Sequence, residues 1–100
     1  MPVRSGDDEA VEGGHLHSGG ASLRWTLDGS ALFCSDFEGD PASFRAVIEA
    51  ANAVAVGRFA AVLLARVHAQ DGRLDALRKA GFLDDGEPLE GYLTLVRDVR

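Results

Sequence analysis

Three histidines and one cysteine are the side chains of this chain best suited to binding a metal or attacking a substrate. His15 and His17 flank Leu16 in a glycine-rich stretch, and two imidazole nitrogens can bind a transition metal. Structural and catalytic metal sites normally use three or four protein ligands, and no third ligand accompanies this pair. We therefore expect no metal site at these histidines.

Cys34 and His68 are the other pair with reactive chemistry, because a histidine base can activate a cysteine nucleophile. Cys34 lies in an apolar segment typical of a strand, where a thiol normally packs as a small apolar group. His68 follows a second apolar segment, and no third group to orient it is evident. We therefore predict no catalytic, cofactor-binding or metal-binding residues, and no cofactor.

Acidic side chains gather in the C-terminal half of the chain. Oxygen ligands at regular spacing bind Ca²⁺, but the spacing here is irregular. Runs of charge usually form a solvated surface, and we expect one here. The residues are Asp71, Asp75, Asp84, Asp85 and Glu87.

The composition limits the class of protein. The chain has 100 residues, enough for one domain, and it carries 10 Lys and Arg against 16 Asp and Glu, for a net charge of −6. This balance argues against direct nucleic-acid binding, which relies on clustered Lys and Arg. A single cysteine excludes an internal disulfide, and no segment reads as a signal peptide or a membrane span. We expect a cytoplasmic protein without membrane contact.

The first twenty residues read as a separate region. Residues 1–20 are acidic and rich in glycine, and they offer few apolar side chains to offset the entropy of ordering the backbone. We expect a disordered tail here. Residues 21–100 are then expected to form a single α/β domain.

Turn pairs, helix caps and hydrophobic patterns predict the elements of that domain. Asp28-Gly29 is typical of a hairpin turn, and Asp40 followed by Pro41 is typical of a helix N-terminus. The apolar run at residues 59–67 is typical of a strand covered on both faces. The expected fold is α+β, with a small mixed sheet of about four strands and two helices in the order ββαβαβ. Its elements are strands at 21–27, 31–37, 59–67 and 92–96 and helices at 41–56 and 71–80.

The helix expected at residues 41–56 carries apolar residues or alanine on nearly every side. A surface helix in a small domain normally has a broad polar face, so a second protein is one way to cover this helix. The helix propensity of alanine is the other explanation. We predict a homodimer, with the helix and two aromatic side chains at the interface. The expected interface residues are Trp25, Phe44, Ala46, Ile48, Ala51, Ala53 and Tyr92.

Two segments near the C-terminus resemble the GNAT N-acetyltransferase superfamily. Residues 77–82 read Leu-Arg-Lys-Ala-Gly-Phe, and an acidic turn leads from them to Tyr-Leu-Thr-Leu-Val at residues 92–96. A short helix that ends in Gly-Phe and is followed by such a strand is common in the C-terminal half of these enzymes. The resemblance covers about residues 31–98, and it implies a truncated GNAT fold.

Several positions depart from the chemistry of that family. GNAT enzymes hold the pyrophosphate of acetyl-CoA in a glycine-rich loop, where backbone N–H groups and a helix N-terminus face the phosphates. The corresponding loop here, residues 38–43, has one glycine, two carboxylates and a proline that lacks an N–H. The resemblance also places Leu77 where the family often has a tyrosine general acid, and Gln70 where it often has an asparagine that contacts the cofactor.

Three functions follow as alternatives. The first is a non-catalytic GNAT-like protein-interaction or regulatory module, with a second copy of the chain as the expected partner. The second is a minimal CoA-dependent N-acyltransferase. The third is a small acidic inhibitor that competes with nucleic acid for a basic groove, which the size and the net charge of −6 permit.

Overall fold

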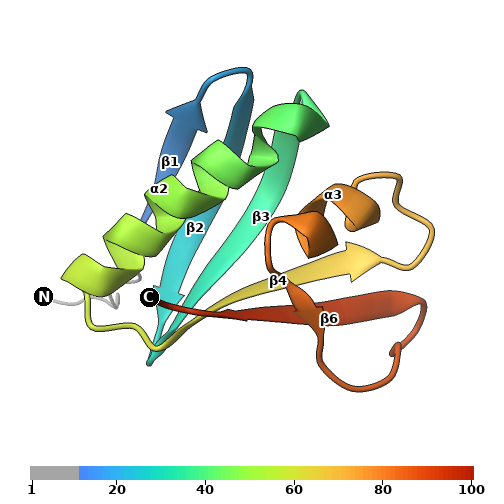
Figure 1. Cartoon of the computed structure of the whole chain (residues 1–100). Coiled ribbons are helices and arrows are strands. Elements are labelled where there is room, and N and C mark those ends of the chain that lie inside the picture. Colours follow the sequence, from blue (N-terminus) through green and yellow to red (C-terminus); the bar gives the residue numbers. More distant parts are fainter. Residues whose placement is uncertain (1–11) are drawn as a thin grey trace, which may run out of the picture.

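The strands form one mixed β-sheet, and two helices lie on it (Figure 1). The computed structural model describes residues 12–100. In chain order the elements are β1 (Gly13–Ser18), β2 (Ala21–Asp28), β3 (Ala31–Gly39), the 3-10 turn η1 (Pro41–Ser43), α2 (Phe44–Gly57), β4 (Val62–His68), α3 (Leu74–Lys79), β5 (Leu83–Asp84) and β6 (Tyr92–Asp98).

The strands of the described residues lie in the order β1-β2-β3-β4-β6-β5. β1, β2 and β3 are antiparallel neighbours, β3 and β4 are parallel, and β6 runs antiparallel to both β4 and β5. A parallel pair requires a crossover connection, and α2 provides it. The α+β class and the order ββαβαβ are confirmed, with β1 and the two-residue β5 as additional strands.

The disordered tail expected at residues 1–20 is wrong over residues 13–18, which form β1. This strand pairs with β2 along its whole length, from Gly13 opposite Thr26 to Ser18 opposite Ala21. An edge strand is held by backbone hydrogen bonds, so it does not need many apolar side chains. Gly14 also lies against the Trp25 indole, where a Cβ atom would be 2.8 Å from Nε1. The remainder of the expected tail, residues 1–11, lies outside the described residues.

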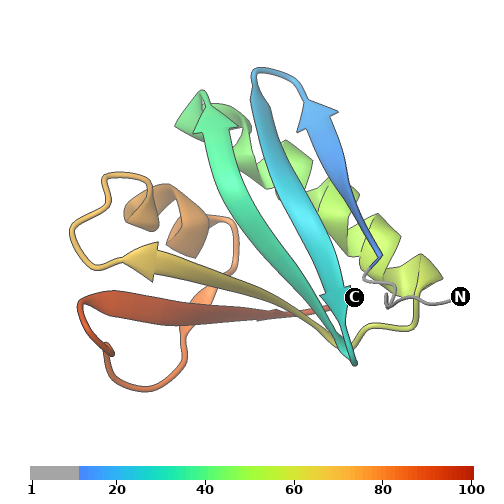
Figure 2. The same ribbon diagram turned by 180° about the vertical axis from the view of Figure 1, so that it is seen from behind.

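Both helices pack on one face of the sheet, and the view from behind shows the strands in front of them (Figure 2). Successive side chains of a strand point to opposite faces, so every second residue faces the helices. These side chains and the apolar sides of the helices form the core. Its largest fully buried members are Phe44, Phe82, Leu23, Leu32, Ile48, Leu63, Leu77 and Leu95.

The opposite face of the sheet carries no helix in the described part of the chain. In β4, Leu63, Ala65 and Val67 are buried under the helices, whereas Val62 and Leu64 on the other face are only half-buried. The expectation that this strand is covered on both faces is therefore wrong for a single chain. The reason is topological, because α2 and α3 both lie on the same side.

The apolar surface of α2 is explained within the chain. Five of its apolar residues face the sheet and are fully buried, and they are Phe44, Val47, Ile48, Ala51 and Ala55.

No helix in residues 12–100 is long and apolar enough to cross a membrane.

Candidate functional site

The main irregularity of the sheet is an opening between β3 and β4. These parallel strands pair only over four residues, from Ala31 with Val62 to Cys34 with Ala65, and then they diverge (Figures 1 and 2). A bulge in β3 lies just beyond the last pair, where Asp36 has a φ of 53° and the register with β2 shifts. The bulge turns Phe37 toward the helices, so Phe33 and Phe37 lie on opposite faces rather than on one as the alternation alone suggests.

A hollow of about 360 Å³ lies at this opening. Its walls are rich in ionisable side chains from the ends of β3 and β4, from the loop before α3 and from the start of β6. They are Asp36, Glu38, Arg66, His68, Asp71, Arg73 and Tyr92. A charged group of either sign that entered this hollow would therefore meet a side chain of opposite charge.

Arg73 crosses the opening and occupies part of it. Its guanidinium donates a hydrogen bond to the backbone carbonyl of Phe37 on β3. The same group donates to both carboxylate oxygens of Asp71, with Nε 2.9 Å from Oδ1 and Nη2 2.6 Å from Oδ2. The side chain thus ties the segment before α3 to β3 beyond the bulge, and it uses a carbonyl that the divergence of the strands would otherwise leave free.

The Asp71–Arg73 pair makes stability depend on pH. Hydrogen bonds from Arg73 lower the pKa of the Asp71 carboxyl below its ordinary value of 3.8. A carboxyl with a lower pKa in the folded state stabilises the protein above its unfolded pKa, and this contribution is lost as the pH falls through the folded pKa. We expect Asp71→Asn to lower the free energy of unfolding at neutral pH by up to about 1 kcal/mol.

Urea unfolding at a series of pH values measures this effect. The difference between wild type and Asp71→Asn should shrink as the pH falls below the ordinary pKa of aspartate. Asp75→Asn, which alters the exposed Asp75–Lys79 pair, serves as the matched control. A difference for Asp71→Asn that stays constant down to acid pH would contradict the assignment.

The backbone N–H groups just before and at the start of α2 already donate to acceptors within the chain. Asp40 acts as an N-cap as predicted, but of the 3-10 turn η1 that leads into α2, where its Oδ1 accepts from the Ala42 N–H at 3.1 Å. The Ser43 N–H donates to the Asp40 carbonyl at 2.8 Å, and the Phe44 N–H donates to the Pro41 carbonyl. Pro41 has no N–H. The first turn therefore presents a carboxylate in place of free donors.

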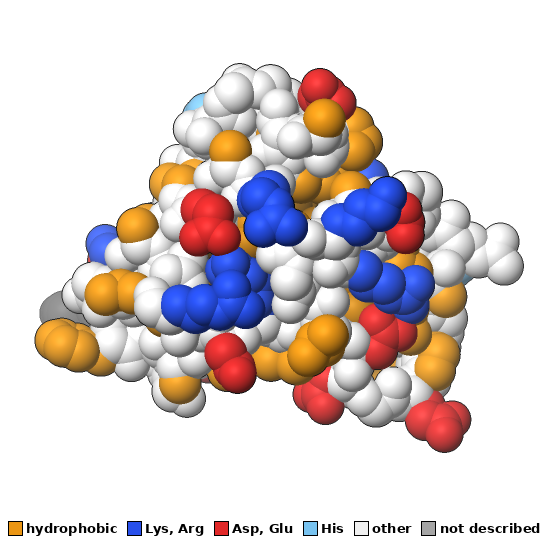
Figure 3. Space-filling model, in the orientation of Figure 1, with side chains coloured by type: hydrophobic (Ala, Val, Ile, Leu, Met, Phe, Trp, Pro, Cys, Tyr) orange, Lys and Arg blue, Asp and Glu red, His pale blue; other side chains and the backbone are white. Residues whose placement is uncertain are grey.

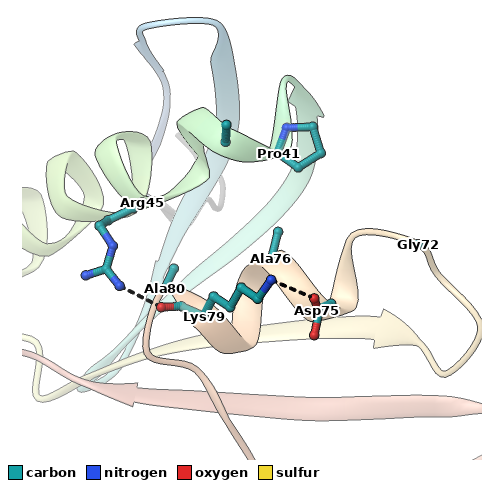
Figure 4. Close-up of a pocket in the computed structure, with 8 residues that line it drawn as sticks. Pro41, Arg45, Gly72, Asp75, Ala76, Lys79 and Ala80 are labelled. Carbon is teal, nitrogen blue, oxygen red and sulfur yellow. Dashed lines mark hydrogen bonds and ion pairs between the residues drawn. The ribbon is translucent and has the colours of Figure 1, made fainter.

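A second hollow, of about 370 Å³, lies between the start of α2 and α3 (Figure 4). Arg45 of α2 bridges it, since its Nη2 donates to the backbone carbonyl of Lys79 at 2.7 Å. Lys79 pairs with Asp75 one turn earlier, at 3.2 Å. The cations at this groove are thus held by groups of the chain itself.

Basic side chains gather on the face that carries the helices, although the chain is acidic as a whole (Figure 3). On this face Arg78 pairs with Asp84 at 2.7 Å. Arg45 and Lys79 of the two helices have the partners described above, so each of these three cations already contacts another group of the chain. Arg97, which is buried, pairs with Glu49 at 2.6 Å.

Arg97 of β6 is a buried charged residue, and the sequence analysis did not identify it. It is 2% exposed, and besides Glu49 it contacts the Asn52 amide oxygen at 3.4 Å. Asn52 also donates to the Arg100 carbonyl at 2.9 Å. The polar side chains Glu49 and Asn52 of α2 therefore hold the C-terminal end of the chain. The position of Arg97 among the alternating apolar residues of β6 is the signal that it points inward.

The residues considered for chemistry do not converge on one site. The His15 and His17 rings lie 4.8 Å apart between centroids and are tilted by 56° to each other, and no group of three metal-ligating side chains occurs within residues 12–100. Cys34 is buried under the helices, whereas His68 is exposed and its Nδ1 accepts from the Gln70 N–H. Leu77 is fully buried in the core. The acidic residues are divided among separate ion pairs: Asp71 with Arg73, Asp75 with Lys79 and Asp84 with Arg78.

We expect the Cys34 thiol to be unreactive in the folded protein. Burial raises its pKa to about 12, so almost no thiolate is present at neutral pH. The native chain should react with a thiol reagent at a rate set by unfolding, whereas the urea-denatured chain should react at once. Rapid labelling of the native chain, at the rate of free cysteine, would contradict this placement.

The expected interface residues are distributed over three environments. Phe44, Ile48 and Ala51 are fully buried against the sheet, so their assignment to an interface is wrong. Ala46 and Ala53 are exposed on the outer side of α2. Two aromatic residues complete the set: Trp25 is 7% exposed, and Tyr92 is 45% exposed.

Comparison with known proteins relates this fold to a group of enzymes. No protein-family model matches the sequence, and no curated protein is similar to it in sequence. The PaiA N-acetyltransferase of Thermoplasma acidophilum, solved in complex with coenzyme A, superposes with a TM-score of 0.68 at 9% identity, over 79% of this chain and 53% of that chain. The ribosomal-protein-S18-alanine N-acetyltransferase of Escherichia coli gives a TM-score of 0.64 at 14% identity, over 93% and 72%.

A third example is the GNAT domain of the S. lividans protein PAT, with a TM-score of 0.64 at 19% identity over 79% of this chain and 53% of that chain. At such identities the likeness shows the fold alone. In these three comparisons, this chain spans between 53% and 72% of the length of its neighbour.

Proposed function

We propose that this chain, which has the fold of the GNAT N-acetyltransferases, is a protein-interaction module that associates with a second copy and does not transfer acetyl groups. The observation that supports this most is the start of α2, where the chain's own groups use the backbone donors. The proposal keeps the fold and assigns it a binding role.

The turn η1, which leads into α2, is poorly suited to a phosphate group. A helix N-terminus binds phosphate when its free N–H groups and positive dipole end face the anion. Here the Asp40 carboxylate occupies the Ala42 N–H, and Glu38 adds a second negative charge in the same loop. Coenzyme A, with which the Thermoplasma neighbour was crystallised, carries a pyrophosphate. That group would meet two carboxylates at this position.

The opening between β3 and β4 also supports a binding role without acetyl transfer. Arg73 occupies the Phe37 carbonyl beyond the bulge, so an extended ligand would have to displace a guanidinium that also pairs with Asp71. Leu77 offers no proton at the position that the resemblance assigns to a general acid, and its side chain is buried. The site therefore lacks both a phosphate cradle and a proton donor at the family's positions.

We expect acetyl-CoA in large excess to leave the melting temperature unchanged. A ligand present at about a hundred times its Kd would stabilise the folded chain by about 2.7 kcal/mol, which a thermal-shift assay resolves. The Thermoplasma neighbour provides the positive control, since it was crystallised with coenzyme A. A concentration-dependent rise in the melting temperature of this chain would overturn the proposal.

The acyltransferase alternative rests on the groove between α2 and α3. Arg45 and Lys79 place two cations beside the start of α2, which is the one feature here that favours an anionic cofactor. A rise in melting temperature with acetyl-CoA that is lost in Arg45→Ala would support this alternative.

A further inference from the structure

The sheet face away from the helices carries a continuous row of side chains that crosses every strand. Backbone pairing places Gly13 opposite Thr26, Thr26 opposite Phe33, Phe33 opposite Leu64, Leu64 opposite Val96, and Val96 opposite Leu83. All the side chains of this central row are half-buried except Leu83, which is 69% exposed. Apart from Gly13 and Thr26 the row is wholly apolar.

The two neighbouring rows carry opposite charges. Two residues along each strand to one side lie Arg24 of β2 and Arg66 of β4, with His15 opposite Arg24. Two residues to the other side lie Asp28 of β2 and Asp98 of β6, which the pairs Asp28–Ala31, Ala31–Val62 and Val62–Asp98 place in one row. The face is therefore basic, apolar and acidic in succession.

The basic row has few internal partners. Arg24 lies 4.0 Å from Asp36, and both side chains are largely exposed. Arg66 is exposed, and its guanidinium lies over the Tyr92 ring at 5.7 Å from the centroid. Contacts of this kind are weak in water, so both arginines are free to pair with another molecule.

This charge order is self-complementary. A two-fold axis along the central row, in the plane of an interface, lays the apolar row of one copy on that of the other and exchanges the flanking rows. The basic row of each copy then faces the acidic row of its partner, and Arg24 lies opposite the partner's Asp28. An axis along the strands would instead set the basic row of one copy against the basic row of the other. The charges thus select one arrangement.

Burial gives a second reason for a partner on this face. Strands that are buried on both faces carry apolar residues on both, and β3 and β4 carry Phe33 and Leu64 on this face. The half-buried Phe33 and Leu64 form one of the parallel pairs. A sheet packed face to face on a second sheet covers such residues in the manner of a β-sandwich.

We propose that a second copy of this chain packs on the open sheet face, with central row on central row and basic row on acidic row. The inference rests on the self-association in the proposed function and names its surface. It places the interface on the sheet face away from the helices, whereas the sequence analysis centred it on the helix at residues 41–56.

Sedimentation equilibrium of the full chain tests this surface through charge exchange. The wild type should sediment at twice its mass of 10.6 kDa. Arg24→Glu and Asp28→Arg should each weaken the dimer at least about tenfold, because each sets like charges against each other. The double variant Arg24→Glu/Asp28→Arg should restore it, since the charges are exchanged within both copies.

Matched controls separate this surface from other causes. Lys79→Glu alters the net charge as much as Arg24→Glu, but it lies on the helix face and should leave the dimer intact. Circular dichroism of each variant verifies that the fold is retained. The substituted residues are exposed in the monomer, so loss of folding is not expected.

Three results would overturn the inference. A dimer that Arg24→Glu leaves intact while Ala53→Glu splits it would put the second copy on α2, and it would leave the proposed self-association standing. If the double variant failed to restore association, Arg24 would not pair with the partner's Asp28, and the proposed arrangement of the two sheets would be wrong. If the wild type sedimented as a monomer at high concentration, the proposed self-association would be wrong as well. The acetyl-CoA assay is independent of this result, because it tests only whether the chain binds the cofactor.

Discussion

Replacing Phe44 by alanine is expected to lower the free energy of unfolding by about 3–5 kcal/mol. Phe44 is the first residue of α2 and is fully buried. Its ring lies 5.9 Å from that of Phe37, which the bulge in β3 turns toward the helices. The substitution therefore removes the contact that joins the helix start to the strand beside the opening, and it leaves a cavity that neither element can close.

Urea unfolding followed by circular dichroism measures this loss. Phe59→Ala is the matched control, because Phe59 is 93% exposed and its removal should change stability by no more than about 0.5 kcal/mol. Comparable losses for both variants would contradict the placement of Phe44 in the core.

Gly39→Ala should be the most damaging change in the loop before α2. Gly39 has a φ of 97°, which residues with a side chain rarely adopt, and a Cβ atom there would overlap the Gly20 carbonyl oxygen and lie 2.9 Å from Ala21 Cα. The same carbonyl accepts from the Asp40 N–H at 2.9 Å, so the loop cannot move away without losing that bond. The single glycine of the loop thus serves backbone packing.

Gly86→Ala separates the cost of a positive φ from the cost of steric overlap. Gly86 has a φ of 83°, and no atom lies near the position of its missing Cβ. Both variants carry the penalty of positive φ, and Gly39→Ala should cost about 1–3 kcal/mol more for the overlap. Equal losses in thermal unfolding would show that the loop has more room than the structure indicates.

The sequence predicted the features that local chemistry determines. Asp40 acts as an N-cap through the Ala42 N–H, and the order of elements from β2 to β6 follows from turn pairs and hydrophobic patterns. The resemblance carried by residues 77–82 and 92–96 led to the correct fold. Each of these signals lies within a few residues of the structure that it specifies.

The features that were missed depend on partners far apart in the chain. β1 is held by β2, and its glycines gave no sign of this pairing. Arg73 and Phe37 are 36 residues apart, so the bridge across the opening leaves no local pattern. The bulge at Asp36 also reversed the faces expected for the end of β3, because one extra residue shifts the alternation.

Three residues of the predicted interface proved to be buried for a related reason. An apolar helix indicates that something covers it, but periodicity does not say whether the cover is the chain's own sheet. Phe44, Ile48 and Ala51 turned out to face the core, and the uncovered apolar row lies on the other side of the sheet. The order of charges across that row became visible only with the strand register.

In this chain, groups of the protein itself already use the hydrogen-bond donors where this fold would take up acetyl-CoA. Titrating the ¹⁵N-labelled chain with acetyl-CoA tests this most directly, since each backbone amide reports on its own surroundings. We expect the amide signals of Ala42, Ser43, Phe44 and Arg73 to remain unmoved throughout the titration, because each of these N–H groups already donates to an oxygen of the chain. Saturable shifts at the start of α2 and at Arg73 would contradict this expectation and restore the acyltransferase.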